Sequence, residues 1–131
     1  MQIHQTIIIL YVEDQELSCK FYQKLLRKAP ILDVPGMSEF EINEHLKIGI
    51  MPNAGIAKIL EPSASHPATG TGIPRCELYF YVASIEKEFE NAIQIGAKLI
   101  SPIQERDWGE KVGYLSDPDG HIVAFAEKLN Y

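Results

Sequence analysis

The chain has 131 residues, of which 46% are hydrophobic and 23% are charged, a composition typical of globular proteins and unlike that of disordered ones. This length suits one domain, or two very small modules that share a core. Acidic side chains outnumber basic ones by 18 to 12, and the formal net charge is −6. That balance argues against a nucleic-acid partner, which requires a basic face. It mildly favours a cationic or neutral small ligand, although solubility alone also explains it.

The cysteines and the N-terminal residues suggest a compartment. Cys19 and Cys76 lie far apart and form neither a metal-binding nor a redox spacing, so we expect a reducing environment. The apolar run Ile7–Leu10 is too short to span a bilayer. Residues 1–6 lack the pattern of a signal peptide. The expectation is a soluble cytoplasmic protein without a membrane partner.

The first half of the chain begins with a strand pattern and a helix pattern. Thr6–Val12 is β-branched and apolar, which predicts a strand. Asp14 stands at a helix N-cap position, and apolar residues then recur at helical spacing from Gln15 to Arg27. Pro30 ends this helix. Four short strands are predicted next, at Ile31–Val34, Glu39–Ile42, Leu46–Met51 and Ile56–Leu60.

The second half repeats this pattern after a connector. Residues 61–74 contain three prolines and two glycines without periodicity, which is typical of a linking segment. A strand is then predicted at Glu77–Val82, followed by a helix at Ile85–Ile95 that Ser84 caps. Asp117–Gly120, with the sequence Asp-Pro-Asp-Gly, predicts a turn. Three further strands are predicted at Lys98–Ser101, Lys111–Leu115 and Ile122–Ala126.

The two halves are similar to each other, which indicates an internal repeat. Three segments of the first half match three of the second half in the same order: Leu10–Val12 with Phe80–Val82, Lys47–Met51 with Lys111–Leu115, and Ile56–Glu61 with Ile122–Glu127. We therefore interpret the chain as one strand–helix–three-strand module used twice. The modules comprise residues 1–62 and 76–131, and residues 63–75 connect them.

Two such modules, with the Asp117–Gly120 turn before the last strand, resemble the vicinal oxygen chelate superfamily. This group includes glyoxalases, bleomycin-resistance proteins and extradiol dioxygenases. The resemblance extends over residues 6–127 and implies an α+β fold. Two βαβββ modules would form curled mixed β-sheets around a cleft, with the helices outside. Because small members of the superfamily often form dimers, the resemblance also implies a homodimer.

Enzymes of this superfamily usually hold a divalent metal with four side chains from the first and last strands of both modules. The resemblance carries these positions onto Ile7, Lys58, Glu77 and Ala124, of which only Glu77 has a ligating side chain. A catalytic metal needs about three protein ligands. We therefore expect neither a metal nor another cofactor at these positions, and we interpret His121 as a surface or turn residue.

Strand alternation predicts the lining of the cleft. If Glu77 faces the cleft, so do Tyr79 and Tyr81, and Tyr114 adds aromatic surface. Trp108, in a Trp-Gly pair similar to that of the bleomycin-resistance branch, is a candidate for stacking on an aromatic or cationic ligand. Packing of Trp108 over the sheet edge or a dimer partner is the alternative. Such a lining suits binding a flat organic ligand better than activating water.

Lys58 and Glu77 carry opposite charges at two of the positions that superfamily enzymes use for metal. If both side chains project into the cleft, an ammonium–carboxylate contact replaces the charge of the metal. The alternative is that one or both are ordinary charges that face solvent.

The leading interpretation is a protein that binds a small organic ligand, cationic or aromatic, without a catalytic metal and without breaking a bond. The acidic residues Glu105, Asp107 and Glu110 around Trp108 favour a cation there. One alternative is a glyoxalase- or dioxygenase-type enzyme that uses Glu77 as a metal ligand, or as a general base if apolar neighbours raise its pKa towards neutrality. Another is a protein whose sheets serve mainly as an interaction surface.

Overall fold

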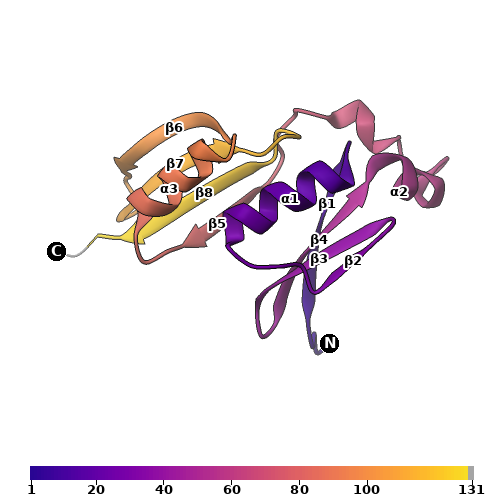
Figure 1. The fold of residues 1–131 in the computed structure, drawn as a ribbon, viewed down its shortest axis with the longest axis horizontal. Helices are drawn as coiled ribbons and strands as arrows, with labels where there is room; N and C mark the ends of the chain where they lie inside the picture. Colours follow the sequence, from indigo (N-terminus) through magenta and orange to yellow (C-terminus); the bar gives the residue numbers. More distant parts are fainter. Residues whose placement is uncertain (130–131) are drawn as a thin grey trace. The chain divides into compact units, whose positions relative to one another are not determined.

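The computed structural model describes residues 1–129. The chain divides into two compact units, residues 1–71 and residues 72–131. Each unit contains one four-stranded mixed sheet, with α1 and α2 packed on the first sheet and α3 on the second (Figure 1). The predicted α+β class, built from two modules, is confirmed. Each unit is described by itself below.

Unit 1 is residues 1–71, and its sheet has the strand order β1-β4-β3-β2. Its elements are β1 (Thr6–Val12), α1 (Gln15–Leu26), β2 (Leu32–Val34), β3 (Met37–Asn43), β4 (Leu46–Pro52), α2 (Asn53–Leu60) and the 3₁₀ helix η1 (Pro67–Gly70). Strands β1 and β4 are parallel, and the other pairs are antiparallel. Helix α1 begins where predicted, because the Asp14 carboxylate accepts a hydrogen bond from the backbone N–H of Leu17.

Unit 2 is residues 72–131 and repeats this topology with the strand order β5-β8-β7-β6. Its elements are β5 (Glu77–Tyr81), α3 (Ile85–Gln94), β6 (Lys98–Glu105), β7 (Glu110–Ser116) and β8 (Ile122–Lys128). The hydroxyl of Ser84 caps α3, as the sequence predicts. The backbone N–H of Ile85 also donates to the Glu127 carboxylate at 2.6 Å, which ties the start of α3 to β8.

The predicted strand at Ile56–Leu60 is wrong, because these residues belong to α2. A short apolar run fits a buried strand and a buried helix equally well, and here Ile56 and Ala57 are the apolar residues that α2 buries. The strand that pairs in parallel with β1, as β8 pairs with β5, is β4. Gly49, opposite Ile9, is therefore the counterpart of Ala124, opposite Tyr79. Lys58 instead lies on α2, exposed to solvent.

The two faces of the unit 2 sheet have different coverings. Helix α3 packs against β6, β7 and β8 on one face, where the ring of Phe80 contacts that of Phe125 and Lys111 pairs with Glu86 of α3. The other face carries a small buried cluster of Val112, Ala124 and Ala126. Because side chains alternate along each strand, Tyr79 and Tyr114 pack on this cluster, away from α3.

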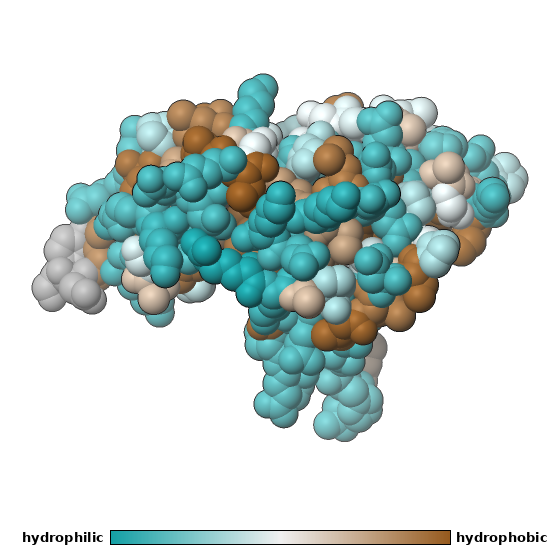
Figure 2. Space-filling model, in the orientation of Figure 1, coloured by the Kyte–Doolittle hydropathy of each residue, from teal (hydrophilic) through white to brown (hydrophobic). Residues whose placement is uncertain are grey.

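The surface combines charged and apolar groups. On the face seen in Figure 2, hydrophilic side chains surround smaller hydrophobic patches. Large exposed apolar side chains include Ile59, Ile73, Tyr81 and Trp108. Within residues 1–129, no helix combines the length and the apolar character needed to cross a membrane.

Candidate functional site

The candidate site is the sheet face of unit 2 that lies opposite α3, which we call the aromatic face. Strand register places its side chains in three cross-strand rows: Tyr79–Ala124–Tyr114, Tyr81–Ala126–Val112, and Lys128–Glu110. Trp108, in the connection between β6 and β7, joins them through a hydrogen bond to Tyr79. Sequence positions that lie far apart therefore meet on one surface.

A chain of hydrogen bonds crosses the aromatic face. The Tyr79 hydroxyl donates to the Glu110 carboxylate at 2.5 Å and accepts from the Trp108 indole N–H at 3.0 Å. Tyr79 reaches from edge strand β5 towards β7 because β8, between them, presents only the methyl groups of Ala124 and Ala126. The chain fixes the position of the indole while leaving 57% of Trp108 exposed.

The hydrogen bonds of this chain also shift the pKa values of its titratable groups. Hydrogen bonds from Tyr79 and then from Tyr81 hold the pKa of Glu110 below its ordinary value, although the residue is only 7% exposed. Burial and the hydrogen bond to Glu110 raise the pKa of Tyr79 to about 12, and the hydrogen bond to Glu110 raises the pKa of Tyr81 as well. At neutral pH Glu110 is therefore a carboxylate, and Tyr79 donates to it as a neutral phenol.

Arg106 covers one aromatic ring of the face. Its guanidinium carbon lies 5.2 Å from the centroid of the Tyr114 ring, within the range of cation–π contact. Nη2 donates to the Ser101 hydroxyl at 3.1 Å and to the Val112 carbonyl at 3.0 Å. Burial raises the pKa of Tyr114, with a further contribution from the charge of Glu77. The Tyr114 ring is therefore already paired with a cation of the protein itself.

Tyr81 is the most exposed tyrosine of the face, at 59%. Its ring forms an edge-to-face contact with Tyr79, at 5.4 Å between centroids. The ammonium nitrogen of Lys128 lies 5.8 Å from the Tyr81 ring centroid. A cavity of about 550 Å³ opens beside this pair, and it is lined by Tyr81, Val82, Ala83, Ala126, Glu127 and Lys128.

The structure brings together four of the predicted ligand-binding residues, namely Tyr79, Tyr81, Trp108 and Tyr114. Glu77 lies on the same face of β5, exposed at the start of the strand. Lys58 and Ile7 belong to unit 1 and Glu77 to unit 2, so the expected contact between Lys58 and Glu77 stays a prediction.

Three charged residues of the aromatic face were not predicted in the roles that they have: Arg106, Glu110 and Lys128. Glu110 was expected among the acids around Trp108 that favour a ligand cation, whereas it is buried and accepts a hydrogen bond from Tyr79. Alternation along β7 places Glu110 on the same side as Tyr114, so the sequence contained that signal. Lys128 lies beyond the predicted end of the last strand, and its register opposite Glu110 comes only from the sheet.

Side-chain atoms of the kind that bind metals lie close together at the Asp117–Gly120 turn, where they form hydrogen bonds within the turn. Oxygen or nitrogen atoms of Asp117, Asp119 and His121 lie within 4.8 Å of one another. One Asp117 oxygen accepts the backbone N–H groups of Asp119 and His121, both at 2.9 Å, and the other lies 2.8 Å from His121 Nδ1. These bonds close the turn, as expected for His121.

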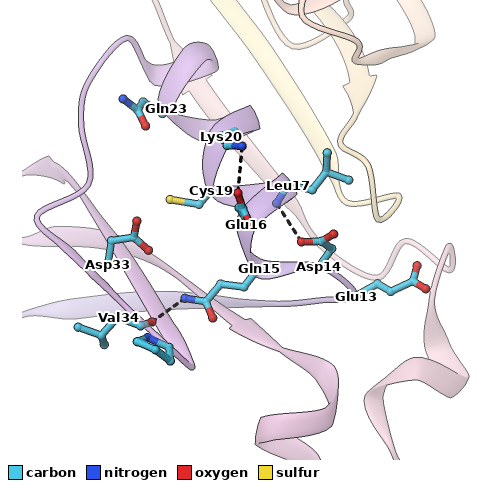
Figure 3. A pocket seen from close by; sticks show the side chains of 11 residues that line it. Glu13, Asp14, Gln15, Glu16, Leu17, Cys19, Lys20, Gln23, Asp33 and Val34 are labelled. Atoms are coloured by element: carbon cyan, nitrogen blue, oxygen red, sulfur yellow. Dashed lines mark hydrogen bonds and ion pairs between the residues drawn. The ribbon is translucent and has the colours of Figure 1, made fainter.

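Unit 1 has a separate hollow of about 890 Å³ between the start of α1 and the β2–β3 hairpin (Figure 3). From α1, Gln15 extends towards Val34 and donates to its carbonyl and to the Ser38 hydroxyl. Ser38 in turn donates to Asp33 at 2.8 Å. Burial raises the pKa of the Cys19 thiol, which keeps it protonated. The two hydrogen bonds from Gln15 fasten the β2–β3 hairpin to α1.

Comparisons with known proteins agree with this topology. Residues 5–130 match the family model described as a glyoxalase-like domain. An uncharacterized protein of Mycobacterium bovis is 25% identical over 115 residues, which are 86% of this chain and 75% of that protein. A glyoxalase/bleomycin resistance protein/dioxygenase family enzyme from Burkholderia phytofirmans superposes with a TM-score of 0.80 at 19% identity, over 94% of this chain and 97% of that one. Protein ATC0852 from Agrobacterium tumefaciens superposes with a TM-score of 0.76 at 26% identity, over 97% and 98% of the two chains.

Proposed function

This chain belongs to the glyoxalase-like domain family, and on that premise we propose that it binds a small aromatic or cationic organic molecule on the aromatic face without a catalytic metal. The observation that carries the proposal is the Trp108–Tyr79–Glu110 hydrogen-bond chain, which holds a half-exposed indole in one position. A fixed, exposed ring is a stacking platform that loses little conformational freedom when a ligand binds.

The donor set does not fit the metal site that the family resemblance implies. Ile7 and Ala124 end in hydrocarbon, and Ala124 is fully buried. Gly49, which replaces Lys58 as the counterpart of Ala124, has no side chain to offer. Glu77 is then one donor where about three are needed. No step of the proposed function depends on a metal.

A calorimetric titration with indole, a neutral planar aromatic, tests the stacking platform. We expect binding to the wild-type protein and weakening by about fivefold or more in Trp108→Leu, because base–aromatic stacking of this kind is worth roughly 1–3 kcal/mol. Ile93→Ala, which trims an exposed apolar side chain of α3, is the control and should bind like the wild type. Equal affinity in Trp108→Leu would contradict the proposal.

Thermal unfolding in the presence of zinc, manganese or nickel ions tests the metal-free part. A metal at one hundred times its Kd stabilises the folded state by about 2.7 kcal/mol. We expect no such increase. An increase that disappears in Glu77→Gln would instead support the enzyme alternative, in which Glu77 is a metal ligand.

The general-base version of that alternative has weaker support. Glu77 is exposed to solvent, whereas a carboxylate tuned to act as a general base near neutral pH lies in apolar surroundings. We also propose that the protein forms a homodimer, from the family resemblance alone, and that it resides in the cytoplasm, from the spacing of its two cysteines. Light scattering on the purified protein tests the first of these two statements.

A further inference from the structure

The position of Lys128 suggests which part of a ligand the aromatic face receives. Strand register sets Lys128 directly opposite Glu110, and its ammonium lies 5.8 Å from the centre of the Tyr81 ring. The charge of Lys128 also helps to lower the pKa of Glu110. A cation of the protein therefore lies where an aromatic ring and a carboxylate both favour positive charge.

The surroundings allow a ligand cation to take the place of the Lys128 ammonium. The adjoining cavity of about 550 Å³ has Ala126 in its lining beside Tyr81 and Lys128, and Ala126 contributes only a methyl group. Tyr81 is 59% exposed, and Lys128 is exposed as well. A lysine ammonium on a flexible stem can therefore leave the ring and return to water at small cost.

We propose that the ring of Tyr81, beside Glu110, is a subsite for the ammonium group of an organic ligand, and that Lys128 is its displaceable occupant in the free protein. This inference rests on the proposed function and adds the chemical class, an aromatic compound with an alkylammonium group. Lys128 is the residue that determines specificity. It competes with ligand cations, and a neutral aromatic ligand that stacks on Trp108 does not need to displace it.

The test compares benzyltrimethylammonium with benzyl alcohol as probes, using calorimetry on the wild type and on Lys128→Met. The variant removes the charge and keeps an unbranched, flexible side chain that is one heavy atom shorter. We expect the cation to bind about two- to fivefold more tightly to Lys128→Met, the range that corresponds to an exposed cation–π contact of about 0.5–1 kcal/mol. Affinity for benzyl alcohol should not change. Lys87→Met, which removes an exposed charge of α3, controls for net charge and should behave like the wild type.

Proton NMR gives a direct readout of displacement. In the free wild-type protein, the ε-methylene protons of Lys128 should be shifted upfield by the Tyr81 ring and should move towards their solvent-exposed values on saturation with benzyltrimethylammonium. Binding of that probe without this movement, or unchanged cation affinity in Lys128→Met, overturns the inference. A loss of cation affinity in that variant overturns it too.

The two proposals fail in different ways. If benzyl alcohol binds, and Trp108→Leu weakens its binding while Lys128→Met leaves cation affinity unchanged, only the ammonium subsite is wrong. If neither probe binds to the wild type or to Lys128→Met, the proposed function and the subsite are both wrong. If phenylphosphonate binds and Lys128→Met abolishes that binding, Lys128 recognises an anion and the subsite is wrong.

Discussion

The Tyr79 hydroxyl donates to the Glu110 carboxylate at 2.5 Å across the intervening strand β8. This bond joins an edge strand to an inner strand through side chains alone. It also sets the position of Trp108, whose indole N–H donates to the same hydroxyl. Trp108, Tyr79 and Glu110 therefore form one hydrogen-bonded network and are not independent groups.

Tyr79→Phe should break the hydrogen-bonded network of Trp108, Tyr79 and Glu110. The substitution removes the donor to Glu110 and the acceptor for Trp108, so we expect a loss of about 1–3 kcal/mol in the free energy of unfolding. The emission of Trp108, the sole tryptophan, should shift as its N–H turns to water. Denaturant unfolding followed by fluorescence measures both. Tyr11→Phe in β1 of unit 1 is the matched control, and an equal loss there would contradict the role of the hydrogen-bond chain.

His121 should make stability depend on pH near neutrality. Burial alone would lower the pKa of His121, but the hydrogen bond and the charge of Asp117 outweigh it and raise the value above 6.5. A raised pKa means that the folded state binds the proton more tightly. The stabilisation is therefore present in full below pH 6.5 and is lost as the pH rises through the folded-state pKa.

Unfolding curves of the wild type and of His121→Gln across this pH range test the expectation. The difference between the two proteins should be about 1 kcal/mol larger at low pH than at high pH, as for a charge-assisted hydrogen bond. His4→Gln, at an exposed residue before β1, should follow the wild type. A difference that grows with pH would show the opposite linkage.

Gly113 of β7 and Gly49 of β4 are strand glycines with different tolerances for a methyl group. A Cβ on Gly113 would lie 2.5 Å from the Phe89 ring of α3 and 2.9 Å from Ile103. A Cβ on Gly49 would meet mainly the terminal methyl of Ile9, also at 2.5 Å, which a rotamer change can move. We expect Gly113→Ala to cost about 1–3 kcal/mol as overpacking and Gly49→Ala to cost less. Thermal unfolding of the two variants gives the order, and the reverse order would refute this explanation.

Gln15 should be important for the stability of unit 1. Its amide donates to the Val34 carbonyl at 2.8 Å and accepts from the Gly36 backbone N–H at 2.8 Å, so it joins α1 to the β2–β3 hairpin. Gln15→Ala removes these bonds, and we expect a loss of about 1–3 kcal/mol. Hydrogen exchange at the hairpin amides should also accelerate. Gln23→Ala, on the exposed side of the same helix, should change neither quantity.

Local patterns in the sequence predicted much of the fold. Seven-residue β1 and the Asp14 cap were found because β-branched runs and N-caps depend on adjacent residues. The predicted strand at Ile56–Leu60 was wrong, because a five-residue run with four apolar side chains fits a helix as well as a strand. That error also misplaced Lys58, since it shifted the internal repeat by one strand.

The sequence by itself determined the α+β class, the two modules and the shared face of Tyr79 and Tyr81, because strand alternation has a fixed period of two. Only the tertiary structure decided that Glu110 lies within reach of Tyr79 and that Lys128 stands opposite Glu110. These contacts join residues far apart in the chain, and they depend on which strands pair and in what register. Strand order and register result from packing the whole sheet, so no local pattern encodes them.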